Sequence, residues 1–309
     1  MNKYAIALIV LACVTSIVRF GHVYPDSQKY LDYIEYFDGE GGIEDVPAPF
    51  ALRPVMPFVV SLLNGIGDSF LILSTLNVFF VCLIGLGIYR YVRSYSIDEK
   101  PAFYAAAICT ASFPVAFYGA VPLVDALAVL VMVAVVIGMM EGLGDWFAMT
   151  MLLLGVIVKE IVLFIGLYYV LREGVKRIWV LVPASVLHLV LRFLIFGELS
   201  NTLVFNLNIF DRLFEVVGVT GISFALPVTI LLIRIRNDKC QHWKSISKDT
   251  FLGIFALLPL VLLGLFFAYF DARFLWPLYL PLAPMIACSL TTSPEVSSSD
   301  SMQQSNERP

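Results

Sequence analysis

A few ionisable residues stand in or beside long apolar segments, where charged side chains are costly to bury. Three of them are the bases Arg53, Lys159 and Arg273, and both arginine forks and lysine point charges suit phosphate oxygens. We therefore expect these bases to hold a phosphate or pyrophosphate group. Asp26 and Asp125 are candidate general bases, because a carboxylate beside a bound phosphate can take the proton of an acceptor hydroxyl. Further candidates for substrate contact are Tyr30, Glu160 and Asp271.

The stretch from residue 19 to residue 54 is the longest non-hydrophobic segment before the C-terminal tail, and it carries seven acids and three bases. A proline and an acid suit a helix start there, and aromatic residues recur at helical spacing, so we predict a short helix from Asp26 to Phe37. On that helix Asp26, Tyr30 and Tyr33 share one face. The tyrosines fit a sugar pocket, and they also fit the alternative of an aromatic belt at a membrane interface.

Apolar residues make up 60% of the chain and charged residues 14%, which is typical of a protein whose solvent is lipid. Apolar runs of roughly 18 or more residues recur, long enough for a helix to cross a bilayer core of about 30 Å. We therefore predict an all-α, multi-pass membrane bundle of about ten transmembrane helices. The first run lacks a small-residue cleavage site, so we interpret it as a retained span. The predicted crossings are residues 4–18, 69–88, 101–119, 122–140, 144–158, 160–171, 178–196, 213–233, 250–269 and 274–290.

Two segments fit a simple crossing poorly. The stretch from Arg53 to Gly67 is apolar but short and interrupted by prolines, so we predict a helix lying in the outer interface. Residues 146–171 would otherwise form one helix with Lys159 and Glu160 at its centre, and a pair of charges midway across lipid is expensive. A turn at these two residues near the outer surface avoids that cost, so we favour a close pair of short helices.

The distribution of lysine and arginine predicts which side each loop faces. With a cytoplasmic N-terminus, 13 of the 20 bases fall in inner loops and termini, as the positive-inside rule requires. Residues 1–290 then form one polytopic domain in the cell membrane, with residues 19–68 as an extracytoplasmic loop and interfacial helix. Residues 291–309 form a polar cytoplasmic tail whose composition is typical of disorder. The bases left for the outer half are Arg19, Lys29, Arg53, Lys159, Arg192, Arg212 and Arg273.

Isolated charges near the ends of membrane helices often only anchor the helix at the interface. Five or six of them on one side of a bundle are harder to explain in that way, so we predict a polar cavity open to the outer leaflet. No GxxxxGK[ST], HExxH or GxSxG motif occurs, so nucleotide-driven transport, zinc proteolysis and serine hydrolysis have no support. A divalent cation would fit where acids cluster, but nothing in the sequence specifies one and we assign no metal ligand.

The order of these motifs resembles the GT-C superfamily. These are multi-pass glycosyltransferases that use polyprenyl-phosphate sugars, such as protein O-mannosyltransferases and the aminoarabinose transferase of lipid A. The resemblance covers residues 1–290 and is at the level of the superfamily. It combines an acid and a tyrosine after the first span, Arg-Pro before an interfacial helix, an aspartate starting a later span, a lysine turn between short helices, and Asp-x-Arg before the last span. The residues are Asp26-Ser-Gln-Lys-Tyr30, Leu52-Arg53-Pro54-Val-Met-Pro57, Val121-Pro-Leu-Val-Asp125, Gly155-Val-Ile-Val-Lys159-Glu160 and Asp271-Ala-Arg273.

This resemblance implies an inverting transfer of a sugar, for example mannose, from a polyprenyl-phosphate donor to an extracytoplasmic acceptor. By the same resemblance Asp26 would be the catalytic base, and Arg53, Lys159 and Arg273 would contact the carrier phosphate. The implied partners are the lipid-linked sugar and membrane lipid, with no nucleic acid.

Two other classes of protein remain open. A transporter or flippase of a lipid-linked or anionic substrate often shows internal repeats and charges near mid-membrane, and no repeat is visible here. An open path to the cytoplasmic side would favour that class. A non-catalytic membrane subunit would leave Asp26, Asp125, Lys159 and Arg273 on separate faces, more than about 10 Å from any common cavity.

Overall fold

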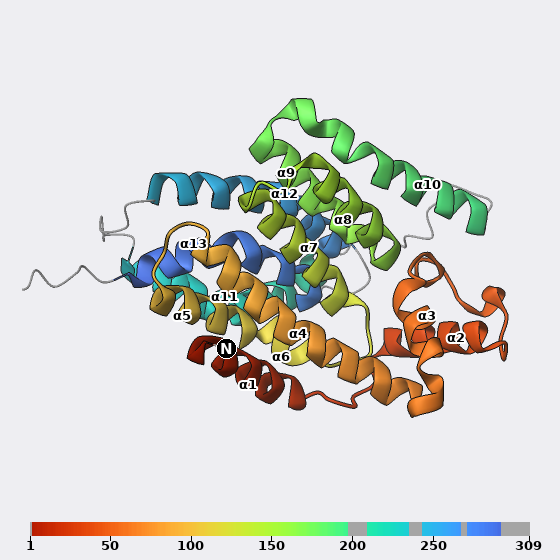
Figure 1. The fold of residues 1–309 in the computed structure, drawn as a ribbon. Coiled ribbons are helices and arrows are strands. Elements are labelled where there is room, and N and C mark those ends of the chain that lie inside the picture. The colour runs from red at the N-terminus through yellow and green to blue at the C-terminus, as the bar shows by residue number, and fades with distance from the viewer. Residues whose placement is uncertain (1, 197–208, 235–242, 267–270, 292–309) are drawn as a thin grey trace, which may run out of the picture.

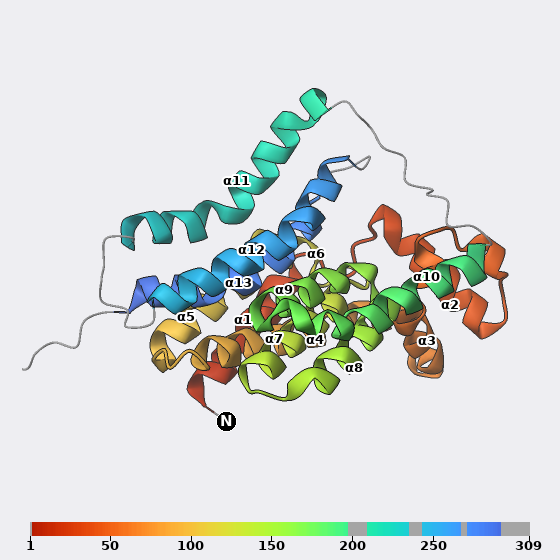
Figure 2. The same ribbon diagram turned by 90° about the horizontal axis from the view of Figure 1, so that it is seen from above.

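The structure is a computed structural model that describes residues 2–196, 209–234, 243–266 and 271–291, and these ranges are all-helical (Figures 1 and 2). Short 3-10 helices link several of the α-helices. The α-helices are α1 (Lys3–Ile17), α2 (Pro25–Asp38), α3 (Val55–Leu62), α4 (Ser69–Arg93), α5 (Glu99–Thr110), α6 (Phe113–Tyr118), α7 (Asp125–Met140), α8 (Gly144–Val158), α9 (Leu163–Glu173), α10 (Val182–Phe196), α11 (Ile209–Arg234), α12 (Trp243–Phe266) and α13 (Tyr279–Leu290).

Four helical stretches within the described residues are long and apolar enough to cross a bilayer. Shorter apolar helices accompany them, and large apolar side chains such as Phe79, Phe193 and Phe251 are exposed on the outside of the bundle. A helical protein with several apolar helices of spanning length is thus established, which suggests a membrane location. The ten crossings and the side each loop faces stay predictions. The four long stretches are Ser69–Arg93, Val175–Phe196, Trp243–Leu262 and Ala272–Leu290.

The helices α4 and α7 form the centre of the packing. Helix α4 contacts α1, α5 and α7, and α7 contacts α8 and α9 in turn. Two glycines of α4 permit this close approach, because a Cβ on Gly87 would collide with Val133 of α7 and one on Gly85 with Thr110 of α5. The buried side chains between α4 and α7 include Val81, Ile84, Ile88, Val129, Met132, Val133 and Val136.

The helices α2 and α3 lie together at one end of the bundle in both views (Figures 1 and 2). The predicted helix from Asp26 to Phe37 is confirmed, because α2 covers Pro25–Asp38 and ends at Gly39 in the left-handed conformation (φ 81°). Tyr33 is buried on the inner face and donates a hydrogen bond to the carbonyl of Ala51 at 3.0 Å. This bond ties α2 to the turn that precedes Arg53. A helix after Arg53 is confirmed as α3, while its position in an interface stays a prediction.

The structure corrects two predicted crossings. The segment 101–119 is not one helix, because α5 ends at Thr110 and α6 begins at Phe113. Ser112 adopts an extended backbone, and Pro114 in the first turn of α6 favours a new helix start over a continuation. The predicted crossing 122–140 begins only at Asp125, since the residues before it form a loop.

The predicted turn at Lys159 is confirmed. Helix α8 ends at Val158, Lys159 is extended (φ −166°, ψ 130°), and a 3-10 turn over Glu160–Val162 leads into α9. The end of the predicted crossing 250–269 and nearly all of the predicted tail 291–309 lie outside the described residues.

Candidate functional site

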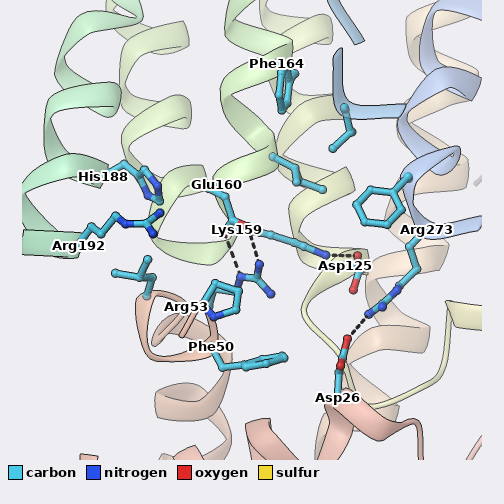
Figure 3. Close-up of a pocket in the computed structure, with 15 residues that line it drawn as sticks. Asp26, Phe50, Arg53, Asp125, Lys159, Glu160, Phe164, His188, Arg192 and Arg273 are labelled. Atoms are coloured by element: carbon cyan, nitrogen blue, oxygen red, sulfur yellow. Dashed lines mark hydrogen bonds and ion pairs between the residues drawn. The ribbon is translucent and has the colours of Figure 1, made fainter. Parts of the chain in front are cut away.

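A cavity of about 380 Å³ lies between α2, the turn before Arg53, the start of α7, the Lys159 turn and α10 (Figure 3). Its apolar lining residues are Pro49, Phe50, Leu52, Ile161, Phe164, Leu260 and Phe274. The rest is ionisable, formed by Asp26, Arg53, Asp125, Lys159, Glu160, His188, Arg192 and Arg273. A cavity lined by both apolar and charged side chains fits a ligand that is itself part apolar and part anionic.

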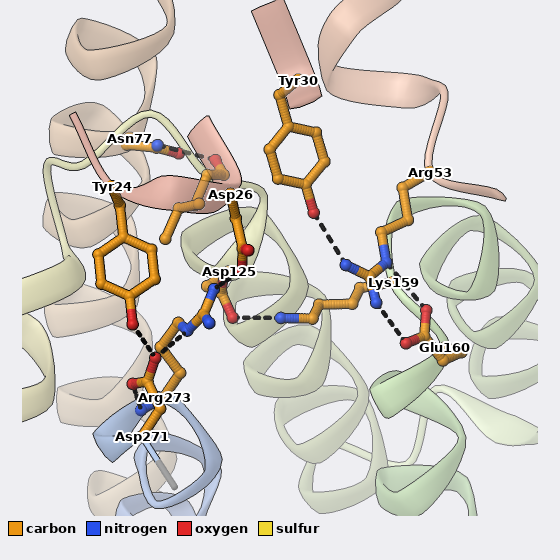
Figure 4. Close-up of polar contacts among 11 residues, drawn as sticks. Tyr24, Asp26, Tyr30, Arg53, Asn77, Asp125, Lys159, Glu160, Asp271 and Arg273 are labelled. Atoms are coloured by element: carbon orange, nitrogen blue, oxygen red, sulfur yellow. Dashed lines mark hydrogen bonds and ion pairs between the residues drawn. The ribbon is translucent and has the colours of Figure 1, made fainter. Parts of the chain in front are cut away.

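At one side of the cavity, Arg273 joins the start of α2 to the segment before α13 (Figure 4). Its Nη1 donates to Asp26 Oδ2 at 2.8 Å, and its Nε donates to Asp271 Oδ2 at 2.7 Å. Tyr24 donates its hydroxyl to the same Asp271 oxygen at 2.9 Å. Burial and the nearby Asp271 charge raise the pKa of Tyr24 to about 12, so that hydroxyl keeps its proton. Asp271 is thereby fixed, whereas the Asp26 side chain is 32% exposed.

Asp125 and Lys159 form a buried ion pair in the middle of the cavity wall. Lys159 Nζ lies 2.5 Å from Asp125 Oδ1, and the two residues are 8% and 2% exposed. Asp125 is the first residue of α7, where the helix dipole favours a negative charge. Its Oδ2 is buried and makes no hydrogen bond within the described residues. The pair therefore retains one acceptor that is unused.

The loop that delivers Asp125 is held by Asn77 of α4. Asn77 is 1% exposed, and its Nδ2 donates to the carbonyls of Val121 at 2.7 Å and Leu123 at 2.9 Å. Buried carbonyl groups need such partners, and here one side chain supplies two of them. Asn77 therefore positions the start of α7 from outside the cavity (Figure 4).

Arg53 binds both carboxylate oxygens of Glu160 through its guanidinium. Nη2 lies 2.5 Å from Oε1 and Nε lies 3.0 Å from Oε2, while Nη1 donates to the Tyr30 hydroxyl at 2.9 Å. Burial opposes ionisation of Glu160, but the adjacent Arg53 outweighs it and lowers the pKa of Glu160 to about 2. Burial raises the pKa of Tyr30 to about 12, so Tyr30 is a neutral acceptor. Each of the three guanidinium nitrogens of Arg53 therefore donates one hydrogen bond to these two residues.

The three cations predicted to contact phosphate each face a carboxylate. Figure 4 shows the Lys159–Asp125 pair between the Arg53–Glu160 pair and the Arg273–Asp26 pair. An anionic ligand must therefore compete with these carboxylates for the cations. Removing one partner of a buried pair without replacing it is strongly unfavourable, so ligand oxygens must take over the donors that the carboxylates release.

The predicted site residues converge at this cavity. Six of them line it directly, namely Asp26, Arg53, Asp125, Lys159, Glu160 and Arg273. Tyr30 and Asp271 contact those residues by hydrogen bonds. The separate placement expected of a non-catalytic subunit is not found. The functional roles of the residues stay predictions.

Arg192, another base predicted for the outer half, also lines the cavity, whereas Arg19 and Lys29 lie elsewhere. Arg19 covers the ring of Phe117 at 3.8 Å, and Lys29 pairs with Asp32 on the surface of α2. The side chain of Arg212 lies outside the part of the chain whose side chains the structure describes.

The sequence reasoning missed the contribution of His188. This single histidine on an apolar helix belongs to no motif, and only its spacing of four residues from Arg192 could have indicated a shared face. Phe50, Phe164 and Leu260 were also missed, because an apolar residue that lines a cavity looks the same in sequence as one in the core.

Among the described residues, no group of three or more His, Cys, Asp or Glu side chains is arranged to hold a metal ion. The divalent cation considered from the sequence therefore has no identified ligand set in this part of the chain. No protein-family model, curated protein or solved structure matches the chain.

Proposed function

We propose that the protein is a membrane glycosyltransferase. It moves a sugar such as mannose from a polyprenyl-phosphate donor to an extracytoplasmic acceptor hydroxyl, with inversion at the anomeric carbon. The observation that carries this proposal is the convergence of Asp26, Asp125, Lys159 and Arg273 on one cavity that apolar side chains also line. The resemblance of the motif order to the GT-C superfamily supports the same activity.

Asp26 is the best candidate for the general base among the acids of the cavity. Both oxygens of Glu160 bind Arg53, and Asp125 is buried against Lys159. Asp26 uses one oxygen toward Arg273 among the described residues, and its side chain is 32% exposed. It is therefore the carboxylate that an acceptor hydroxyl can reach with the least rearrangement.

The reaction balances with these groups. The acceptor oxygen forms a bond to the anomeric carbon on the face opposite the phosphate, and its proton passes to Asp26. The bond between the anomeric carbon and the phosphate oxygen breaks, and the electron pair leaves with the phosphate. Lys159 and Arg273 stabilise the charge that develops on this leaving group. When a phosphate oxygen of the donor binds Arg273, it replaces Asp26 in the ion pair with that arginine. Donor binding therefore frees the Asp26 carboxylate to accept the proton.

The test is Asp26→Asn in the full chain in lipid nanodiscs, with radiolabelled polyprenyl-phosphate sugars and membrane acceptors. We expect kcat to fall about 100-fold or more, because general base catalysis contributes about 10²–10⁴-fold. The matched control is Asp32→Asn on the same helix, where Asp32 pairs with its helix neighbours Lys29 and Gln28 and does not line the cavity. Transfer by Asp26→Asn at the wild-type rate would show that the mechanism is wrong.

A further inference from the structure

The buried carboxylate of Asp125 has one oxygen that the proposed mechanism does not use. Its Oδ1 accepts a hydrogen bond from Lys159, whereas Oδ2 is buried and has no hydrogen-bond partner in the described part of the chain. No other carboxylate oxygen of those residues is both buried and without a partner. An oxygen that loses its hydration without gaining a hydrogen bond is unfavourable, and more so when it carries charge.

The other two buried aspartates of the described residues have their hydrogen bonds supplied from within the protein. Asp271 accepts at both oxygens, from Arg273 and Tyr24. Asp249 accepts two hydrogen bonds, one from a tyrosine and one from an arginine. Neither of these aspartates lines the cavity, whereas Asp125 does. The unsatisfied oxygen therefore belongs to the buried aspartate that stands beside the space for a ligand.

Asp125 also lies between two of the cations that the proposed mechanism assigns to the donor phosphate. Figure 3 shows its carboxylate between Lys159 and Arg273. A phosphate that binds Lys159 competes with Asp125 for the ammonium group and weakens their ion pair. A buried carboxylate that loses its cation is strongly unfavourable. The ligand that binds best is therefore one that brings hydrogen-bond donors to Asp125 together with its phosphate.

We propose that Asp125 accepts a hydrogen bond from a hydroxyl of the donor sugar and thereby determines which lipid phosphate the cavity retains. The hydroxyl on the carbon next to the anomeric carbon is the ring hydroxyl closest to the phosphate along the covalent structure, and it is the one that we assign to Asp125. The inference rests on the donor of the proposed function. After transfer, the remaining polyprenyl phosphate has no such hydroxyl, so Asp125 favours its exchange for a new donor.

The first test measures ligand binding to the wild-type full chain in nanodiscs by isothermal titration. The probes are a polyprenyl phosphate, the same lipid carrying mannose, and two deoxy analogues of that mannosyl lipid. One analogue lacks the hydroxyl next to the anomeric carbon, and the other lacks the hydroxyl on the exocyclic carbon. We expect the mannosyl lipid to bind about 10- to 100-fold more tightly than polyprenyl phosphate, from one hydrogen bond to a charged group. The first analogue should lose most of this preference, and the second should keep it.

The second test is Asp125→Asn, which keeps the volume of the side chain and removes its charge. Lys159 then has no carboxylate to exchange, so we expect polyprenyl phosphate to bind about tenfold more tightly than to the wild type. The preference for the mannosyl lipid should fall to less than about threefold, because a neutral acceptor forms the weaker hydrogen bond. A residue that only supported the fold would weaken the binding of both lipids alike.

The matched control is Asp145→Asn. Asp145 is also an acid in the first turn of an apolar helix, α8, and it pairs with Arg177 away from the cavity. We expect this variant to bind polyprenyl phosphate and the mannosyl lipid with the wild-type affinities. The ligand series on the wild type decides the inference by itself if Asp125→Asn does not fold.

Equal affinity of the wild type for the mannosyl lipid and polyprenyl phosphate would overturn the assignment, as would an Asp125→Asn variant with the full wild-type preference. Sugar transfer measured on the same samples separates the two proposals. Transfer without any hydroxyl preference leaves the proposed function and removes the role of Asp125. A preference that depends on Asp125, in a protein without transfer activity, leaves a binding site for a glycosylated lipid phosphate and removes the proposed function.

Discussion

The buried pair of Asp125 and Lys159 permits a quantitative test of the charge arrangement. Lys159→Met keeps most of the volume of the side chain but leaves Asp125, which is 2% exposed, without its cation. Removing one partner of a buried ion pair costs about 3–5 kcal/mol, because the remaining charge is neither solvated nor paired. We therefore expect the midpoint of thermal unfolding to fall by on the order of 10 °C.

The double variant Asp125→Leu with Lys159→Met separates the charge from the packing. It replaces both ions by apolar groups, a change that is often neutral or stabilising for a buried pair. We expect it to recover most of the stability that Lys159→Met loses, and to remain without transfer activity. If the double variant keeps its stability but has no activity, the ion pair is needed for function and not for folding.

The assay is thermal unfolding of purified protein in one detergent, followed by intrinsic tryptophan fluorescence, with sugar transfer measured on the same samples. Arg90→Gln is the control, since its ion pair is largely exposed and should change stability by less than about 1 kcal/mol. An unchanged midpoint in Lys159→Met, or a double variant no more stable than the single one, would refute the view that Asp125 is a buried charge held by Lys159.

Two further predictions concern the residues that support the cavity. Asn77→Leu removes the donor to two buried carbonyls, which costs about 1–3 kcal/mol for each. We expect the unfolding midpoint to fall and kcat for transfer to drop about tenfold, because Asp125 shifts. Thermal unfolding and kcat are the measurements, and an unaffected kcat would contradict the positioning role. The pKa of Glu160 lies at about 2, below its ordinary value, so its bond to Arg53 stabilises the fold above about pH 4.5 and is lost as the pH falls toward 2. The difference in unfolding midpoint between wild type and Glu160→Gln should therefore be constant from pH 8 to pH 5 and should shrink toward zero below pH 4.5. A difference that disappears between pH 8 and pH 6 would be inconsistent with this ion pair.

The sequence predicted local structure best where one physical effect dominated. The helix α2 follows from a proline and an acid at its start and aromatic residues at helical spacing, and the break at Lys159 follows from the cost of a charge pair inside a long apolar helix. The break between α5 and α6 was missed because Ser112 and Pro114 interrupt a segment whose hydropathy alone resembles one span.

The candidate site was predictable in its charged residues and not in its geometry. Ionisable residues are easy to recognise in an apolar sequence, so six cavity residues could be selected from the sequence alone. Their pairing depends on contacts between distant segments, and nothing local predicts that Arg53 meets Glu160 or that Arg273 meets Asp26. Asn77 acts through backbone carbonyls, which have no sequence signature at all.

The bond between Arg273 and Asp26 has a consequence for biosynthesis, because it joins residues 247 positions apart. While the protein is being made, Asp26 has left the ribosome long before Arg273 exists. The Arg273–Asp26 contact can therefore form only after nearly every helix of the chain has been synthesised. A chain interrupted before residue 271 would contain both partners of the Arg53–Glu160 pair but not Arg273, so we expect its first loop to be more sensitive to proteolysis than that of the full chain.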